Sequence, residues 1–451
     1  MTDITPDNIG AGPSRSSILR PDARTTKRNA AEKRFRIYGM IAIAIGMFFL
    51  VALLTTIISR GIPAFQQTFI VLNVDLPEET LDKSGTRDLD EMKKVSTFGY
   101  SPLIDQAMAD ALAGQGIENP FESAKDLGAL LSASAAAQVR DQVLANPDLV
   151  GTSHEFKVLA SSRVDGYLKG RVTRESIERD KSISPAHLDL VDALQDEGVV
   201  TKSFNWSFIT GADASESRPE QAGIGVSMLG SLYMMFVVLA LSLPIGVAAS
   251  IYLEEFAKQN RFTDLIEVNI SNLAAVPSIV FGILGLAVFI QFVHLPQSAP
   301  LVGGLVLTLM TLPTIIISTR AAIKAVPPSI REAALGIGAS KTQTVFHHVL
   351  PLAMPGILTG TIIGLAQALG ETAPLLLIGM VGYIASNYPD GVMDGFLSPN
   401  SAMPAQIYEW AKRADPAYYE RAWGGIIILL IFLMTMNIIA VILRRRFERR
   451  W

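Results

Sequence analysis

Six long apolar runs constrain the fold of this sequence more than any other feature. They cover residues 37–59, 224–253, 270–293, 301–319, 356–381 and 422–443. Each run is long enough for a helix to cross a hydrocarbon core about 30 Å thick. The composition agrees, because 49% of the residues are hydrophobic and 18% are charged, whereas soluble domains carry about 25% charged residues. We therefore predict an all-α membrane protein with six transmembrane helices.

Basic residues gather at both ends of the chain. Residues 1–36 read as a disordered basic tail, and residues 444–451 form a second tail that is mostly Arg. Cytoplasmic flanks of membrane spans carry an excess of Lys and Arg, so we expect both tails in the cytoplasm. The run at 37–59 is too long for a signal-peptide core and no small-residue cleavage site follows it, which favours an uncleaved span. A targeting peptide is a weaker alternative, since acidic residues interrupt the basic tail.

A polar, domain-sized insert occupies residues 60–221, between the first two runs. It holds more acidic than basic residues. Helical patterns begin at residue 104 and cover 127–144, and strand-like patterns cover 155–159 and 164–172, so we predict a soluble α+β domain. Counting spans from the basic N-terminus places this insert outside the cytoplasmic membrane. The chain has no cysteine, which excludes disulfides and thiolate metal sites, and we expect no metal site and no cofactor.

The loop at residues 326–355, which we name the knob, carries dense helix signals between two apolar runs. Ser329 and Glu332 have the spacing of a capping box, and so do Ser340 and Gln343. Gly338 stands between them, where a helix favours a residue in the left-handed conformation. Pro351 is expected to end the second helix, because the residue before proline avoids the helical region. The sequence therefore predicts a helix, a glycine corner and a second helix.

The knob resembles the EAA loop of ABC-importer permeases. The residues that carry the resemblance are Glu332, Ala333, Ala334, Gly338, Leu350 and Pro351. His348 departs from it, since the family usually has an aliphatic residue there. The resemblance implies that these residues dock on a cytoplasmic ATPase and transmit its motion to the membrane helices. One alternative is an ordinary structured loop. A DNA-binding helix-turn-helix is the other, but the knob has few of the basic residues that such a motif uses.

Glu371 is the only charged residue in the six apolar runs. An isolated carboxylate near mid-membrane costs about 2.5–3.5 kcal/mol on insertion scales, which makes it a candidate functional group. Gly360, Gly364, Gln367 and Glu371 recur at helical spacing on one stripe, and Pro374 weakens the backbone just beyond them. The stripe predicts a polar pair that faces protein or a pathway. A structural carboxylate that holds two helices together is the alternative.

The segment Gly370-Glu371-Thr372-Ala373-Pro374-Leu375 resembles the GETAPL signature of phosphate-specific permease subunits of the PstA family. The segment at 277–282, PSIVFG, resembles a second signature of that family. The family commonly has an arginine, the natural partner of a phosphate anion, four residues before the glutamate, where this chain has Gln367. The resemblance implies a substrate pathway through Glu371, Gln367, Thr372, Pro374 and Ser278.

The resemblance further implies a MetI-like permease core of five helices at residues 222–443, preceded by one N-terminal span. It implies a non-catalytic subunit of a phosphate importer in a bacterial inner membrane. Its expected partners are a second homologous permease, a cytoplasmic ABC ATPase dimer, a periplasmic phosphate-binding protein and the lipid bilayer, with no nucleic acid. The alternatives are a permease for another oxyanion, such as sulfate or molybdate, and a membrane-anchored sensor.

Overall fold

The computed structural model describes residues 23–178, 182–380 and 389–447. The chain divides into two compact units, Met1–Thr56 and Ile57–Trp451. The described part of the first unit belongs to α1 (Ala23–Gly61), a helix with large exposed apolar side chains along the run at 37–59. The first span is therefore helical, as predicted. The prediction of a disordered tail is wrong for residues 23–36, because α1 already begins at Ala23.

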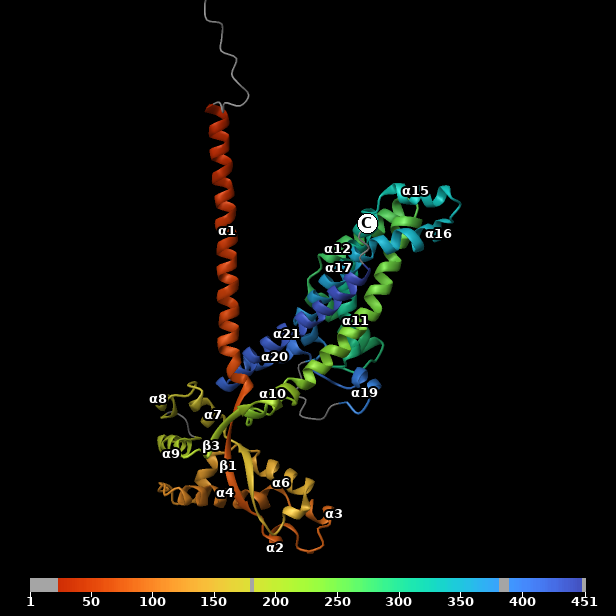
Figure 1. Ribbon diagram of the computed structural model, residues 1–451. Coiled ribbons are helices and arrows are strands. Elements are labelled where there is room, and N and C mark those ends of the chain that lie inside the picture. Colours follow the sequence, from red (N-terminus) through yellow and green to blue (C-terminus); the bar gives the residue numbers. More distant parts are fainter. Residues whose placement is uncertain (1–22, 179–181, 381–388, 448–451) are drawn as a thin grey trace, which may run out of the picture. The chain divides into compact units, whose positions relative to one another are not determined.

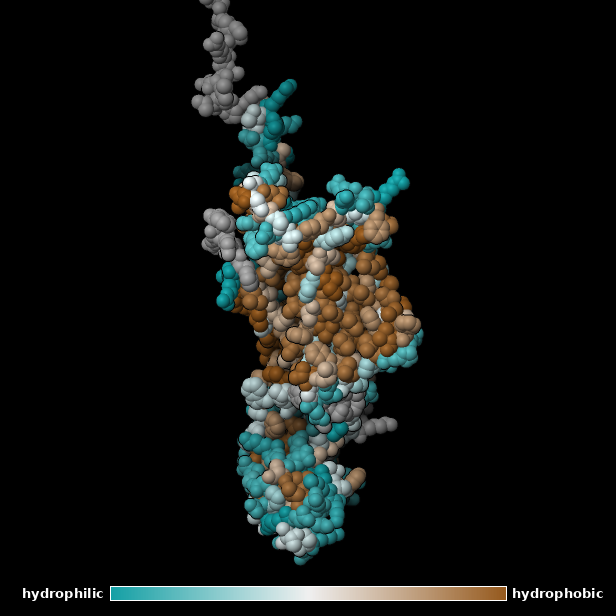
Figure 2. Space-filling model, turned by 90° about the vertical axis from the view of Figure 1, so that its right-hand side faces the viewer, coloured by the Kyte–Doolittle hydropathy of each residue, from teal (hydrophilic) through white to brown (hydrophobic). Residues whose placement is uncertain are grey.

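Five helices of the described residues are long and apolar enough to cross a membrane. They are Ala23–Phe65, Gly225–Phe256, Pro300–Lys324, Lys341–Gly370 and Pro416–Arg446. Four of them belong wholly to the second unit, and Figure 2 shows a broad hydrophobic band on one face, with hydrophilic surface beyond its edges. These five helices match five of the six apolar runs, except that the helix in the run at 356–381 already ends at Gly370.

The remaining apolar run, at residues 270–293, does not form one straight helix. It is divided between α12 (Arg261–Ala274) and a helix over Ser278–Phe292, whose first part is α13 (Ser278–Gly285), and the two are bent by 100°. Pro277 caps α13 and lacks a backbone N–H, and the residue before a proline avoids the helical conformation. The six predicted spans correspond to five long helices and one bent pair among the described residues, and the count of six holds only if the bent pair is one span.

The membrane core of the second unit is built around α14 (Pro300–Lys324), which packs against α11 (Gly225–Ile251) and α17 (Leu350–Gly370). Small residues allow the close approach. A Cβ on Gly304 of α14 would lie 2.5 Å from the Val237 side chain, and one on Gly360 of α17 would lie 2.0 Å from Ser318 Oγ. The last long helix, α21 (Pro416–Phe447), packs against α17 and α20 (Met403–Lys412) (Figure 1).

The insert folds as an α+β domain, as predicted (Figure 1). Its antiparallel sheet has the order β2-β1-β3, with β1 at Gln66–Asp75, β2 at Ser153–Leu159 and β3 at Val200–Phe204. Ile70, Leu72 and Val74 alternate along β1 and are fully buried in the domain core. The main helices are α4 (Thr97–Gly114), α6 (Ala135–Ala145), α7 (Ser162–Leu168) and α9 (Pro185–Asp196).

The predicted strand at 164–172 is wrong, because most of it belongs to α7 and the turn after it. The side chain of Ser161 accepts a hydrogen bond from the Val164 backbone N–H and caps this helix. The remaining short helices of the insert and its linker are α2 (Glu78–Leu81), α3 (Leu89–Met92), α5 (Ala124–Leu127), α8 (Arg174–Ile177) and α10 (Trp206–Thr210). Beyond the insert, α18 (Ala373–Leu377) and α19 (Val392–Leu397) connect α17 to α20.

A ring of four charges, of which the Arg171 side chain is partly exposed and the other three are buried, joins the insert to the first turns of α21. Lys169 Nζ lies 2.7 Å from Asp165 Oδ2 and 2.8 Å from Glu420 Oε1. Arg171 also pairs with both carboxylates and closes the ring. The next residue along α21, Arg421, is buried and donates to the carbonyl oxygens of Ala64 and Glu220. The insert is therefore fixed to the membrane core by charges, with its own hydrophobic core kept separate.

Candidate functional site

The knob begins with α15 (Pro328–Gly336). Its N-cap is Pro327, which makes no side-chain capping bond, and Pro328 occupies the first helical position. The capping box predicted at Ser329 and Glu332 is therefore wrong. Proline already has the φ angle that a first helical residue requires, so α15 starts before Ser329 can act as a cap.

The glycine corner of the knob is confirmed. Gly338 has φ +92°, and its N–H donates to the Leu335 carbonyl at 3.0 Å. The Ala339 N–H donates to the Ala334 carbonyl at 3.1 Å, which completes the hydrogen-bond pattern of a Schellman motif. The second capping box is also confirmed. Ser340 and Gln343 each accept from the other's backbone N–H, at 3.2 and 2.9 Å.

The second helix of the knob does not end before Pro351, so that prediction is wrong. α16 (Lys341–Thr344), a π-helical turn (Val345–Val349) and α17 form one continuous helix, Lys341–Gly370. In a π-helical turn the hydrogen bonds span five residues, and this wider turn accommodates the proline that lacks an N–H. The knob therefore leads into the membrane core without a break.

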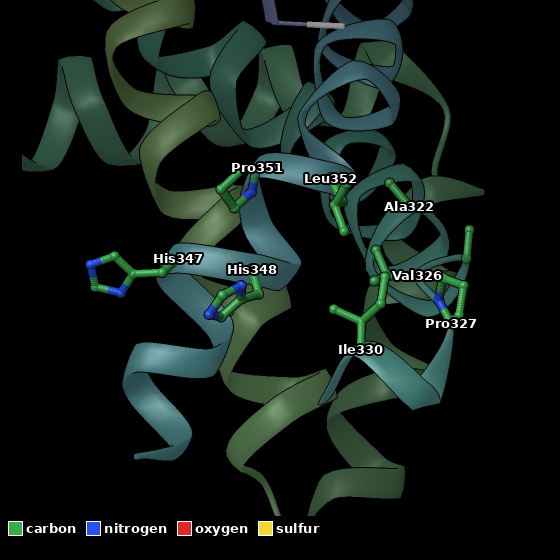
Figure 3. Close-up of a pocket in the computed structure, with 9 residues that line it drawn as sticks. Ala322, Val326, Pro327, Ile330, His347, His348, Pro351 and Leu352 are labelled. Atoms are coloured by element: carbon green, nitrogen blue, oxygen red, sulfur yellow. The ribbon is translucent and has the colours of Figure 1, made fainter. Parts of the chain in front are cut away.

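The outer surface of the knob is partly apolar and lies open in this subunit. Leu335, Ile337 and Phe346 are exposed, Ile337 by 83%. Glu332 and Ala333 are exposed, Ala334 is buried, and Leu350 and Pro351 are half-buried. A cavity of 620 Å³ lies between α15 and the π-helical turn. Figure 3 shows His348 and Ile330 on opposite sides of this cavity, whereas His347 extends away from the other labelled residues.

A second candidate site lies at the other end of α17. The helix ends at Gly370, Glu371 takes an extended conformation with φ −79° and ψ 128°, and α18 starts again at Ala373. The backbone is therefore interrupted beside Pro374. Within the described ranges, the Glu371 carboxylate has no hydrogen bond and no ion pair, and it is half-buried.

The predicted stripe on α17 faces two different surroundings. Gly360 and Gly364 face α14, where their added Cβ atoms would meet Ser318 and Ile315. Gln367, farther along the same stripe, is exposed in this subunit. The first half of the stripe thus packs against a helix, and its polar second half lies open beside the break at Glu371.

The two segments that carry the phosphate-permease resemblance pack against each other, although Gly282 and Pro374 are 92 positions apart in the sequence. A Cβ on Gly282 of α13 would lie 2.7 Å from Pro374 Cα and 3.0 Å from the Pro374 carbonyl oxygen. Only glycine allows this approach, because the atoms it would meet belong to the backbone. Ser278 is the first residue of α13. The breaks before α13 and α18 therefore belong to one packed unit.

Comparisons with known proteins match the N-terminal part of the chain and the membrane core to two different families. Residues 242–451 match the family described as binding-protein-dependent transport system inner membrane component, and residues 22–178 match a domain of unknown function, DUF3333. The phosphate transport system permease protein PstA 1 of Mycobacterium tuberculosis (strain CDC 1551 / Oshkosh) is 32% identical over 234 residues, which are 51% of this chain and 74% of that protein. The chain belongs to the PstA-like family of ABC-transporter permeases.

The permease is also similar to the phosphate transport system permease protein PstA of Pasteurella multocida (strain Pm70). The two are 29% identical over 222 residues, which are 49% of this chain and 76% of the relative. Among solved structures, the inward-facing MetNI methionine ABC transporter is similar over 50% of this chain and 95% of its own, with 16% identity and a TM-score of 0.38. The family and the apolar helices together make this a multi-pass inner-membrane protein.

Sequence reasoning missed the charged residues that hold these elements together. Glu254 and Glu255 at the end of the first core helix pair with Arg320 and Arg331, and Asp165 and Glu420 form the ring at the insert. These residues lie just outside the apolar runs or deep in the insert, so the search for charges inside the runs passed over them. The available signal was the clustering of opposite charges at the ends of neighbouring spans.

Proposed function

We propose that this permease is the translocation subunit of an ATP-driven importer of inorganic phosphate. The observation that carries the proposal is the contact between Gly282 and Pro374, which joins the two phosphate-type signature segments at a double helix break. The relatives named as phosphate transport permeases support the same cargo. Two permease subunits, a cytoplasmic ATPase dimer and a periplasmic phosphate-binding protein would make up the complex.

The proposed pathway passes the break between α17 and α18. Thr372 and Ser278 contribute hydroxyl groups close to the starts of α18 and α13, and interrupted membrane helices present free backbone N–H groups to anions at such points. Gln367 offers a neutral amide where the family commonly has arginine. Pro374 keeps the backbone interrupted and packs on Gly282.

Glu371 is an unusual neighbour for a phosphate anion, because like charges repel strongly where the dielectric constant is low. We assign it the task of orienting hydrogen-bond donors or carrying a proton, instead of touching the anion as a charged group. Among the described residues, its carboxylate has no hydrogen bond and no ion pair, which supports the second task, since an unpaired carboxylate is available to exchange a proton. A carboxylate that only joined two helices would be bonded to one of them.

The proposed ATPase contact is the knob. Glu332, Ala333 and Ala334 of α15, the corner at Gly338, and Leu350 and Pro351 after the π-helical turn supply its docking and coupling residues. The exposed Leu335 and Ile337 support this assignment, since an apolar surface on a polar loop indicates a protein partner. In this topology the knob and both tails are cytoplasmic, and the insert at 60–221 lies in the periplasm as an accessory surface for the binding protein.

Uptake by vesicles tests this proposal. Vesicles that contain the whole complex are given labelled phosphate, with unlabelled sulfate and molybdate as competitors. We expect ATP-dependent phosphate uptake that neither competitor suppresses. Suppression by sulfate or molybdate would favour another oxyanion, and ATP-independent binding without uptake would favour a membrane-anchored sensor.

Two sets of variants locate the pathway and the topology. Glu371→Gln should assemble normally and lose most phosphate uptake, whereas Glu409→Gln on α20 should transport normally. Because the chain has no cysteine, single cysteines at the exposed residues Gln115 and Thr342 can be labelled in intact cells. An impermeant thiol reagent should modify Gln115→Cys alone, and the opposite pattern would overturn the proposed sides.

A further inference from the structure

Arg331 ties the knob to the ends of two membrane helices. Its Nε and Nη2 donate to Glu255 Oε1 at 3.0 and 2.8 Å, and Glu255 ends the span that begins with α11. Its Nη1 and Nη2 also donate to the carbonyl oxygens of Val326 and Ile323, at 2.7 and 2.9 Å, where α14 ends. A planar guanidinium that makes four such bonds fixes direction as well as distance.

A second arginine continues the connection toward the bent pair. Arg320 of α14 lies 3.4 Å from Glu254, the neighbour of Glu255, and 2.6 Å from Glu267 of α12. The side chains of Arg320 and Glu254 are each 16% exposed. Lys324 of α14 also lies 3.5 Å from Glu254. Each of the two adjacent carboxylates therefore has at least one cation, which offsets their mutual repulsion.

These contacts lead from the knob to the candidate pathway. They run from Arg331 through the end of α11 to α14 and then to α12, whose far end bends into α13. There Gly282 packs on Pro374, beside the break at Glu371. The continuous helix Lys341–Gly370 reaches the same break from the knob by a separate route. The knob is thus connected to both halves of the packed unit.

We propose that Arg331, Glu255, Glu254, Arg320 and Glu267 form a charge relay that moves the bent pair α12–α13 in step with the knob. These five are positioning residues, since they act on the pathway through α12 and α13. The inference rests on the proposed function, because it requires an ATPase that moves the knob. In this proposal, the pathway opens when two elements move together: α17, which is continuous with the knob, and the bent pair α12–α13, which the relay moves.

Distances between spin labels test the relay in the complex purified with its ATPase. The parent chain has no cysteine, so nitroxides can be attached at Leu265 on α12 or Ile363 on α17, both 58% exposed, each paired with a label at Ile438 on α21. We expect both distances to change when ATP is trapped. In Glu267→Gln, which removes only the last link to α12, the change at Leu265 should disappear and the change at Ile363 should remain.

Asp264→Asn is the matched control, because Asp264 is an exposed carboxylate one turn earlier on α12 with no ion pair among the described residues. It should keep both changes. Arg331→Gln should lose the Leu265 change as Glu267→Gln does, and Arg331→Lys should keep part of it. A Leu265 distance that still changes in Glu267→Gln, or a loss of both changes together, would overturn the relay.

A transport measurement provides an independent readout. Phosphate taken up per ATP hydrolysed should fall in Glu267→Gln while ATP hydrolysis continues, because α12 and α13 no longer follow the knob. Unchanged uptake per ATP would also overturn the relay. The label distances are measured without any solute, so they test the relay whatever the cargo. Failure of the parent complex to take up phosphate would overturn only the proposed cargo.

Discussion

Removing one cation from the charge ring between the insert and α21 should destabilise the permease strongly. In Lys169→Met, the buried carboxylates of Asp165 and Glu420 lose a partner at 2.7 and 2.8 Å, and the Gln66 carbonyl loses a donor at 2.7 Å. Arg171 would then be the remaining cation that pairs directly with both carboxylates. Breaking a buried ion pair by removing one partner costs about 3–5 kcal/mol.

This cost can be measured as a shift in thermal unfolding. A change of about 1 kcal/mol in the free energy of unfolding moves the thermal midpoint by about 2–4 °C in a domain the size of the insert. Lys169→Met should therefore lower the unfolding midpoint by roughly 6–20 °C. The assay is thermal unfolding of the detergent-solubilised permease, with proteolysis of the insert as a second probe. Lys93→Met, which removes a cation from an exposed ion pair, is the matched control and should change little.

A double variant shows whether the ring acts as a unit. Lys169→Met with Glu420→Gln removes one cation and one carboxylate, so less unpaired charge remains and part of the lost stability should return. A Lys169→Met midpoint within 2 °C of the parent would refute the reasoning, because it would show that water enters the ring and screens its charges.

Three further predictions concern Gly338 in the knob, the contact between Gly282 and Pro374, and the buried carboxyl group of Glu220. Gly338→Val should insert normally but uncouple ATP hydrolysis from uptake, because φ +92° is strained for a β-branched residue; normal uptake by vesicles would exclude a coupling role. Gly282→Val should abolish uptake at least about 100-fold, since its side chain meets Pro374 backbone atoms; uptake at the parent rate would remove the contact from the mechanism. Burial raises the pKa of Glu220, so its carboxyl group stabilises the fold fully below pH 4.5 and loses this contribution as pH rises through the raised value. Glu220→Gln should therefore raise the unfolding midpoint at neutral pH and leave it unchanged below pH 4.5, and an equal shift at both pH values would contradict this.

The parts of the knob that could be predicted from the sequence depend on local chemistry. Gly338 and the Ser340–Gln343 box were predictable, because a left-handed corner requires glycine and a reciprocal cap requires a fixed spacing. The continuation of the helix through Pro351 was not predictable, since the π-helical turn before it has no spacing signal. The start of α15 was misjudged because two prolines compete with Ser329 for the cap.

In the membrane core, too, local sequence patterns predicted the helices but not the contacts between segments that are distant in the sequence. Apolar length identified five helices, but the same criterion hid the bend at Pro277, since residues on both sides of it are apolar. The sequence identified the segments that contain Gly282 and Pro374 by two separate resemblances, but it did not indicate that the two residues pack against each other. In the charge ring, Asp165, Lys169 and Arg171 are close in the chain, but Glu420 lies 251 positions after Lys169. No local pattern therefore contains the whole ring.

The unbroken helix from Lys341 to Gly370 sets a mechanical scale for the permease. Its 30 residues make a rod about 45 Å long, at 1.5 Å per residue. If the knob end is held and the rod tilts by about 5°, its far end moves about 4 Å, which exceeds the length of a hydrogen bond. A rotation that would hardly alter the packing at the knob could therefore make or break every polar contact around Glu371.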